Sequence, residues 1–534
     1  MAPGAEKAGD ELPPPNVHDI ASGAAFRAIG AASAALGALL LNLLLFHRYP
    51  LWTVESLLAL MVLIGVASIY GLLYAAANRW IRAFLEALLI AVIIDGGGAL
   101  APWPMVAGAV VLLFTLSTRR SILSFVTVAA LVAALSSIAG LGQHREQAFT
   151  EITKAPTRSR SSTSLPAIVH IILDEHGGID GMPEDNPRTP QVREALQHFY
   201  IGNGFRLYTR AHSDYAYTLN SVPQVLNFGQ VQEPGSTKEM KQKVEHTAYF
   251  DLLARRGHHI NVYQSEFLDM CASASITHCV TYQSQDMGAV ATSHLTTASK
   301  VSIILRKLTS RSVRKVGGFL YNGVRKLGVP LPFRDISDIR MNPLNAAAAF
   351  DRFNADVAKA KPGDVYFAHI LLPHSPFGLT EDCRLKEGAW IRRERPGALR
   401  PRQDAGYDQL LCALRKTETA FRAISRSAAG DNFVMIVHGD HGSRTTNAKP
   451  FVDQAAIMTD AEKLANFSTL FAVRGPAITP GKDASPLSLS TLVTGLTQSR
   501  YTVAPTGRRT RPSQVFLDDE KHVPLMKINL PAGW

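Results

Sequence analysis

An apolar run ends directly at two carboxyl groups in the sequence Ile168-Val169-His170-Ile171-Ile172-Leu173-Asp174-Glu175. A short, almost continuous apolar run is typical of a strand that is buried on both faces of a sheet. A second such run, Phe433–Val437, is followed closely by Asp440-His441-Gly442. Ligands of open α/β sheets bind beyond the carboxyl ends of the strands. The sequence therefore predicts that the two acidic motifs converge at one edge of a sheet.

Two further segments supply the remaining groups of a catalytic site. Thr218 begins the string Thr218-Leu219-Asn220-Ser221-Val222-Pro223. His374 lies in Pro373-His374-Ser375-Pro376, which follows the strand-like run Val365–Leu372. Carboxylate and imidazole groups can share one cation, and a hydroxyl beside them can act as a nucleophile.

These motifs, in this order, resemble the sulfatase-like branch of the alkaline phosphatase superfamily, and within it the membrane-anchored phosphoethanolamine and phosphoglycerol transferases. That family has an acidic ligand at a strand end, a Thr nucleophile in a T-x-x-S-V-P-like string and a late Asp-His-Gly. The resemblance covers about Ala167 to Gln498 and implies an α/β catalytic domain with a mostly parallel sheet sandwiched by helices. The matching residues are Asp174, Thr218, Ser221, Val222, Pro223, Asp440, His441 and Gly442.

The resemblance implies one divalent cation and a threonine nucleophile. The expected metal ligands are Asp174, Glu175, Thr218, Asp440 and His441. Carboxylates with one imidazole suit Zn or Mn best, and Mg or Ca remain open. Thr218 is the expected nucleophile.

Several assignments keep an alternative. Ser213 and Ser221 are rival nucleophiles, and Glu175 either binds a second metal ion or orients the site. His374 is expected to contact the substrate phosphate or protonate the leaving alcohol, or else to have a structural role. Arg444 either pairs with a phosphoryl oxygen or is exposed. Two further histidines within strand-like runs, His369 and His438, are expected in the core.

Two departures from the family pattern bear on the reaction. The formylglycine sulfatase motif C-x-P-S-R is absent, and no cysteine lies near Thr218. The Glu/Gly-rich stretch and later His that follow Asp-His-Gly in phosphoethanolamine transferases are replaced by Ser443–Pro450. The transferred head group therefore stays open.

Five apolar runs precede the catalytic region, and most approach the roughly 20 residues that cross a bilayer. The first has no basic segment before it, which favours a retained anchor over a cleaved signal peptide. Arg79, Arg82, Arg119 and Arg120 lie in the second and fourth connections, which should be cytoplasmic. The N-terminus is then inside and the catalytic domain outside, as in a bacterial inner-membrane protein with a periplasmic domain. The runs are 24–46, 54–76, 84–100, 104–117 and 121–141.

The cysteines and the net charge fit an external enzyme. All four cysteines lie in the region expected outside, where disulfides form, and pairing of Cys271 with Cys279 and Cys383 with Cys412 is one of three connectivities. Free thiols are the alternative. The net charge of +11 is concentrated in Thr157–Ser164 and Lys300–Arg334, so a nucleic-acid partner is not expected. Lys300–Leu327 predicts a basic amphipathic helix, either at a lipid surface or packed on the catalytic domain.

The leading interpretation is a membrane-anchored, metal-dependent transferase that moves a phospholipid head group onto an envelope glycan or lipid. A membrane-tethered phosphodiesterase or other ester hydrolase is the alternative. An inactive anchored protein that binds envelope polymers is disfavoured, because the nucleophile and ligands are retained. The expected parts are a cytoplasmic segment, a five-helix transmembrane domain, a linker, a catalytic domain and a tail without an assigned role: 1–23, 24–142, 143–166, 167–500 and 501–534.

Overall fold

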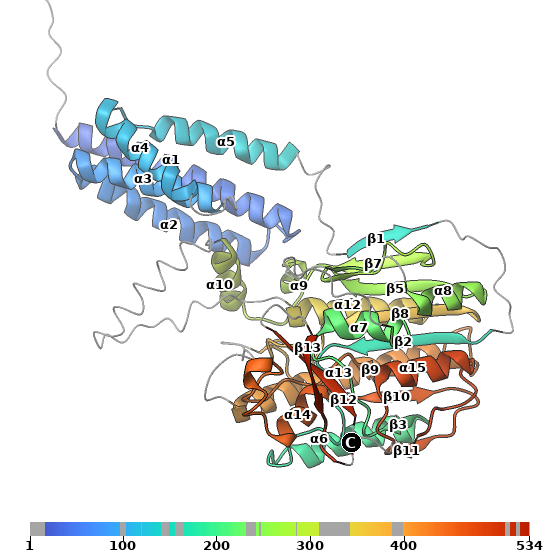
Figure 1. The fold of residues 1–534 in the computed structure, drawn as a ribbon. Helices are drawn as coiled ribbons and strands as arrows, with labels where there is room; N and C mark the ends of the chain where they lie inside the picture. Colours follow the sequence, from blue (N-terminus) through green and yellow to red (C-terminus); the bar gives the residue numbers. More distant parts are fainter. Residues whose placement is uncertain are drawn as a thin grey trace, which may run out of the picture. The chain divides into compact units, whose positions relative to one another are not determined.

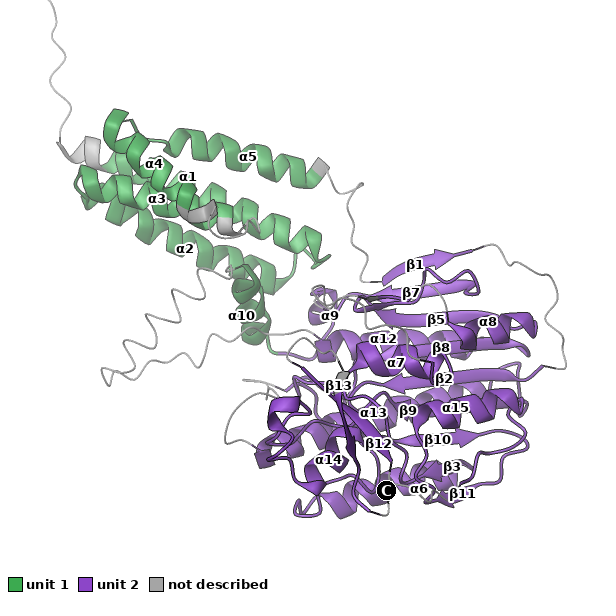
Figure 2. Cartoon of the chain, viewed as in Figure 1, with its two compact units in different colours: residues 1–145, 296–339 green, residues 146–295, 340–534 purple. Residues whose placement is uncertain are grey.

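The chain forms two compact units in a computed structural model, and each is described by itself (Figure 2). Unit 1 comprises residues 1–145 and 296–339, and unit 2 comprises residues 146–295 and 340–534. The structure describes residues 17–96, 103–118, 120–139, 149–154, 165–230, 242–244, 247–284, 286–308, 342–386, 399–507, 513–519, 524–532 and 534.

Unit 1 is helical in its described part, and its first five helices coincide with the five apolar runs (Figure 1). Two stretches, Ser22–Phe46 and Val54–Ala76, are long and apolar enough to cross a membrane by length and composition. The next helix carries two arginines and two acidic residues, and the following two are shorter, so five spans remain a proposal. The helices are α1 (Val17–Phe46), α2 (Val54–Ala76), α3 (Arg79–Gly96), α4 (Trp103–Thr118), α5 (Leu123–Ala139) and α10 (Thr297–Leu308).

Small residues let the first two helices approach closely. Ala28, Ala31 and Ala35 of α1 are buried in the core of unit 1. A Cβ added at Gly71 of α2 would lie only 2.2 Å from Cγ1 of Ile29. In lipid, the hydrophobic effect does not drive apolar helices together. Small residues such as Ala and Gly then let two helices approach closely and gain van der Waals packing energy.

The basic helix expected at Lys300–Leu327 is described as far as Leu308. This part, α10, packs against α2, and Nζ of Lys300 lies 3.4 Å from Oε1 of Glu55. The structure therefore places α10 with the helical unit. Residues 309–327 of the predicted helix lie outside the described residues.

In the described part of unit 2, nine strands form one sheet in the order β1-β7-β5-β8-β2-β9-β10-β3-β11. Five of its eight neighbouring pairs are parallel, as expected for a mostly parallel sheet. The strands are β1 (Phe149–Thr153), β2 (Ala167–Leu173), β3 (Arg206–Tyr208), β5 (His259–Ser265), β7 (His278–Tyr282), β8 (Asp364–Ile370), β9 (Phe433–Gly439), β10 (Phe471–Arg474) and β11 (Gly481–Asp483).

The other described elements of unit 2 are helices and short two-stranded pairs. They are α6 (Thr189–Gly202), α7 (Thr218–Leu226), α8 (Ala248–Arg255), α9 (Gly288–Ala291), α12 (Asn342–Val357), α13 (Leu399–Ser425), η2 (Val452–Gln454), α14 (Asp460–Phe467), α15 (Leu489–Gln498), β4 (Gln242–Lys243) with β6 (Leu268–Asp269), and β12 (Gln514–Asp518) with β13 (Pro524–Asn529).

Helices cover both faces of the sheet, as predicted. Strand β2 is buried along its whole length because alternate residues enter two different apolar clusters. Val169 and Ile171 pack in a cluster with residues of α6, α12 and α13. Ile168 and Ile172 pack on the opposite face with residues of α7, α8 and α15. A strand buried on both faces has to be apolar throughout, which explains the sequence of this run.

Unit 2 extends beyond the expected catalytic domain at both ends. Strand β1 lies inside the expected linker 143–166 and pairs antiparallel with β7. The expected tail, 501–534, contains β12 and β13, which form an antiparallel pair. The linker expectation arose from its Ser, Thr and Arg content, and Thr157–Ser164 lies outside the described residues.

The expected disulfides Cys271–Cys279 and Cys383–Cys412 are both present.

Candidate active site

Three neighbouring parallel strands bring the predicted groups to one edge of the sheet. β2 lies between β8 and β9, and Leu173 pairs with Ile370 on one side and Gly439 on the other. Asp174 and Asp440 directly follow β2 and β9, and His374 follows β8 by four residues. The register therefore places these motifs side by side, as the strand-end pattern predicts.

Thr218 reaches the same edge from another element. It is the first residue of α7, so its hydroxyl lies at the N-terminal end of a helix, which favours negative charge. Its Oγ1 lies 2.7 Å from Oδ2 of Asp440, 3.3 Å from Oδ2 of Asp174 and 3.5 Å from Nε2 of His441. The hydroxyl is thus surrounded by the three groups predicted to share a cation with it.

The donor set fits a divalent cation. Ligand atoms of Asp174, Asp440 and His441 all lie within 4.8 Å of one another, and the three side chains are buried. Oδ1 of Asp174 is buried and has no hydrogen-bond partner, which is costly unless another group satisfies it. Nδ1 of His441 lies 2.9 Å from the Gly442 carbonyl, so assigning the ring proton to Nδ1 leaves the Nε2 lone pair for a metal.

Burial and charge act differently on these three groups. Burial tends to raise the pKa of Asp174, but the nearby imidazoles, first of His374 and then of His369, outweigh burial and lower that pKa. Burial, followed by the Asp174 charge, raises the pKa of Asp440 above its ordinary range. Burial and the nearby Arg444 lower the pKa of His441, which keeps the imidazole neutral. Two close carboxylates and a neutral imidazole suit a bound cation, which would relieve the repulsion between the carboxylates.

Glu175 does not join this group and lies beside His374 instead. Its Oε1 is 3.6 Å from Nε2 of His374, and its Oε2 accepts a hydrogen bond of 3.3 Å from the Ser375 amide. Its backbone amide donates to Oδ1 of Asp440 at 3.0 Å. Of the two roles that the sequence left open, these contacts favour orientation of His374. The backbone of Glu175 is left-handed, with φ of +63°.

Arg444 is buried in the site, so the alternative of an exposed arginine is wrong. Its side chain is 7% exposed, and its guanidinium carbon lies 4.0 Å from the centre of the Tyr217 ring. Nη1 is 3.9 Å from Oε1 of Glu175, and Nη2 is 2.5 Å from Nε2 of His441. For His441 to bind a cation through Nε2, the Arg444 guanidinium would have to move away from that nitrogen. The guanidinium would then be free to pair with an anionic group of the substrate.

The rival nucleophiles have structural partners. The Ser221 hydroxyl donates to the backbone carbonyl of Asp440 at 2.5 Å and lies 2.9 Å from the Ser213 hydroxyl. These contacts tie α7 to the end of β9. Position 442 requires glycine for a steric reason, because a Cβ on Gly442 would lie 2.1 Å from the Ala465 carbonyl oxygen.

Sequence reasoning missed three residues around the site. Gln409 of α13 accepts from the amides of Gly378 and Leu379 and donates to the carbonyls of Pro373 and His374. His369 is a buried strand residue, as expected, but its Nε2 lies 3.6 Å from Oδ2 of Asp174. The sequence signal for His369 was its position three residues before the end of the apolar run. Gln409 gives none, because a glutamine within a helix is ordinary.

The third missed residue, Asp518, comes from the expected tail. Its Oδ2 lies 3.5 Å from Nδ2 of Asn220, two residues after Thr218. Val515 and Leu517 of the same strand pack in one cluster with Tyr217. The C-terminal pair of strands thus supports the start of α7, where Thr218 lies.

Comparisons with known proteins show similarity in structure to sulfatase-like proteins. One is BT1596, a 2-O GAG sulfatase: 12% identity, a TM-score of 0.39, and coverage of 67% of this chain and 79% of that one. Another is the C-terminal periplasmic domain of EcEptC from Escherichia coli in complex with Zn: 13% identity, a TM-score of 0.40, and coverage of 72% and 96%. No protein-family model and no curated protein matches the chain.

These similarities agree with the resemblance drawn from the motifs.

Proposed function

We propose that this chain is a membrane-anchored, metal-dependent transferase that moves the phosphorylated head group of a phospholipid to a hydroxyl or amine of an envelope glycan or lipid. The observation that carries the proposal is the Thr218 hydroxyl, 2.7 Å from Asp440, beside the buried group of Asp174, Asp440 and His441. A nucleophile held against a cation site at the end of a helix suits attack on phosphorus.

Asp174, Asp440, His441 and Thr218 would hold the cation, with Zn or Mn best suited to these ligands. When bound, the cation would lower the pKa of the Thr218 hydroxyl and neutralise charge on the phosphoryl oxygens. Glu175 is not needed as a ligand in this arrangement.

The covalent steps follow from the protein's own groups. In the first, Thr218 Oγ1, whose proton has passed to solvent beforehand, forms a bond to phosphorus. The bond from phosphorus to the diacylglycerol oxygen breaks, and that oxygen takes a proton from the imidazolium of His374. Two observations support this role for His374: its side chain is 24% exposed, and it lies beside Glu175.

The second step restores the enzyme. The acceptor's oxygen or nitrogen attacks phosphorus and gives its proton to His374, while the bond to Thr218 breaks. Oγ1 of Thr218 is thereby released as the alkoxide, ready for the next donor. Arg444 would pair with the phosphoryl oxygens in both steps, as the nearest guanidinium to His441.

Two observations support a lipid donor and disfavour a formylglycine sulfatase. Two helices are long and apolar enough to anchor the chain in a membrane, the compartment that holds phospholipids. All four cysteines of the sequence are in disulfides, so none is available to become a formylglycine near Thr218. We further propose that unit 2 lies on the external, periplasmic side, where disulfides persist.

The test uses the full chain in liposomes whose phospholipid carries a labelled head group. Transfer predicts release of diacylglycerol and movement of the label to an added glycolipid acceptor, both abolished by Thr218→Ala and by a chelator. Label that appears as a free phosphorylated head group in water would make the protein a phosphodiesterase instead. Diacylglycerol release that persists in Thr218→Ala would contradict the proposed nucleophile.

A further inference from the structure

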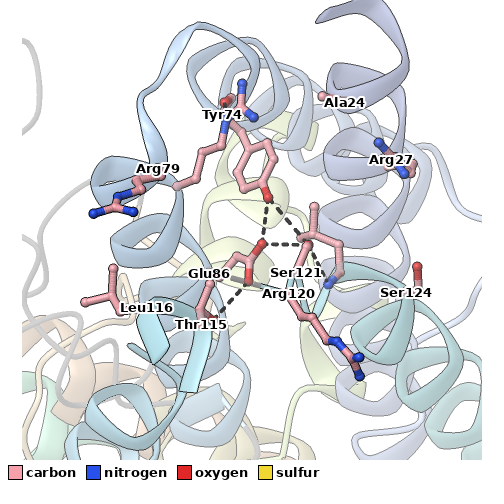
Figure 3. A pocket seen from close by; sticks show the side chains of 12 residues that line it. Ala24, Arg27, Tyr74, Arg79, Glu86, Thr115, Leu116, Arg120, Ser121 and Ser124 are labelled. Carbon is pink, nitrogen blue, oxygen red and sulfur yellow. Dashed lines mark hydrogen bonds between the residues drawn. The ribbon is translucent and has the colours of Figure 1, made fainter. Parts of the chain in front are cut away.

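Unit 1 contains a recess of its own, with a volume of about 730 Å³ (Figure 3). It lies where α2 ends and α3 begins, beside the connection from α4 to α5. Its volume is in the range of small-molecule sites, about 300–1,000 Å³. The lining residues are Ala24, Arg27, Tyr74, Arg79, Arg82, Glu86, Thr115, Leu116, Arg120, Ser121, Leu123 and Ser124.

A buried carboxyl group fixes the walls of the recess. Glu86 of α3 is 1% exposed and lies at the centre of the polar network in Figure 3. Its Oε1 accepts hydrogen bonds from the Tyr74 hydroxyl at 2.6 Å and the Ser121 hydroxyl at 2.7 Å. Its Oε2 accepts from the Ile122 amide at 3.1 Å. Because these donors belong to α2 and to the connection before α5, one acidic side chain joins three segments of the unit.

The recess has a strong excess of positive charge. Among the described lining residues, four arginines accompany the single glutamate. Arg82 already donates hydrogen bonds to the last carbonyls of α2. Its Nε donates to the Tyr74 oxygen and its Nη2 to the Ala75 oxygen, each at 2.9 Å. Arg27, Arg79 and Arg120 form no ion pair with a carboxylate in the described part of the chain, and Figure 3 shows them around Glu86 and its partners.

The outer surface beside the recess suits lipid. Trp80, Phe84 and Leu88 of α3 are each about half exposed, at 57%, 58% and 48%. The guanidinium carbon of Arg79 lies 4.9 Å from the centre of the Trp80 ring. Tryptophan beside arginine at the end of an apolar helix is typical of the membrane interface.

We propose that this recess binds the phosphate group of an anionic phospholipid, with the arginines on the phosphate and the acyl chains along the apolar surface of α3. Guanidinium groups match phosphate oxygens in geometry and charge. Basic pockets between apolar helices are suited to anionic head groups. The site is distinct from the active site, since every lining residue belongs to unit 1, and it does not depend on the proposed reaction. A free phosphate compound has the same chemistry and is the other possible source.

The test is native mass spectrometry of the full chain in detergent with phosphatidylglycerol, with zwitterionic phosphatidylcholine, or with inorganic phosphate. The variants are R79Q/R120Q, which removes two unpaired charges from the recess, and R48Q. Arg48 is a matched control, because it is an exposed arginine in the connection from α1 to α2, outside the lining set. Thermal unfolding checks that each variant folds, and single R120Q replaces the double variant if that one does not.

We expect wild type and R48Q to retain phosphatidylglycerol and not phosphatidylcholine. R79Q/R120Q should bind roughly tenfold more weakly for each lost guanidinium contact. Binding of inorganic phosphate alone, with the same sensitivity to the variants, would identify a soluble phosphate ligand and still support phosphate recognition. Equal retention of phosphatidylglycerol by wild type, R48Q and R79Q/R120Q, or no binding of either phosphate source, would overturn the proposal.

Discussion

The Thr218 hydroxyl donates a hydrogen bond of 2.7 Å to Oδ2 of Asp440, a residue 222 positions later in the chain. One residue begins α7 and the other follows β9, so only the folded sheet brings them together. The Ser221 hydroxyl reinforces the same junction by donating to the Asp440 carbonyl. Thr218 and the buried group of Asp174, Asp440 and His441 are therefore held together by the same tertiary structure.

The two adjacent carboxyl groups should differ in their effect on metal content. Asp174→Asn should remove most of the bound metal, because Asp174 belongs to the buried group with Asp440 and His441. Glu175→Gln should keep near-stoichiometric metal and lower turnover roughly 10- to 100-fold, as expected for a residue that orients others. Elemental analysis of both variants beside their turnover checks this. Loss of metal in Glu175→Gln to the extent seen in Asp174→Asn would show that Glu175 is a ligand.

Gln409 should be needed to position His374. This buried side chain holds the carbonyls of Pro373 and His374 and the amides of Gly378 and Leu379. Gln409→Leu leaves these groups without partners, at a cost of about 1–3 kcal/mol for each that stays buried. Both the melting temperature and turnover should fall. Thr419→Ala, an exposed change on the same helix, should alter neither. Unchanged turnover in a folded Gln409→Leu protein would contradict the positioning role.

Asp518 should make stability depend on pH. Burial raises its pKa to about 7, although the Arg444 guanidinium acts in the opposite direction. The protonated form is therefore favoured in the folded state. Its contribution to stability is present below the unfolded pKa, about 3.9, and is lost as pH rises through about 7.

Asp518→Asn, which stays neutral, should accordingly raise the melting temperature at pH 8 and change it little at pH 4. Each kcal/mol regained should appear as roughly 2–4 °C. Asp453→Asn, at an exposed carboxyl group, is the control and should show no such difference. A melting temperature that falls at pH 8 in Asp518→Asn would mean that the ionised carboxylate is stabilising.

The topology prediction rests on the arginines of the second and fourth connections of unit 1. Reporter fusions after Ala77 and after Arg120 should be active in the cytoplasm, and a fusion after Leu165 should be active outside. The physical reason is the retention of Lys and Arg on the cytoplasmic side. Cytoplasmic activity of the fusion after Leu165 would rule out five spans with an external catalytic unit.

Much of the fold follows from local patterns in the sequence. The continuous apolar runs ending at Asp174 and Asp440 predict buried parallel strands, and the structure has both next to each other. The pattern works because strands covered on both faces must be apolar and because their carboxyl ends meet at one edge. The family resemblance then supplies Thr218, whose place in a helical first turn no periodicity would mark as special.

The remaining features depend on tertiary packing that leaves no local signal. The expected tail gave no role to Asp518, since its burial against Asn220 arises only when β12 packs beside α7. The strand β1 was missed because it is a short edge strand, largely exposed, which lacks an apolar run. Arg444 was undecided because a single arginine looks the same whether it is solvated or stacked on Tyr217.

Mass spectrometry of the Thr218 peptide, after the full chain has been incubated with labelled phospholipid and quenched, tests directly whether Thr218 is the nucleophile. We expect a mass increase on Thr218 equal to the phosphorylated head group, absent in Thr218→Ala and absent after metal removal. Thr218→Ser should retain part of the adduct, because it keeps the hydroxyl and loses only a methyl group. An adduct on Ser213 or Ser221, or full turnover by Thr218→Ala with no adduct on any residue, would show that Thr218 is not the nucleophile.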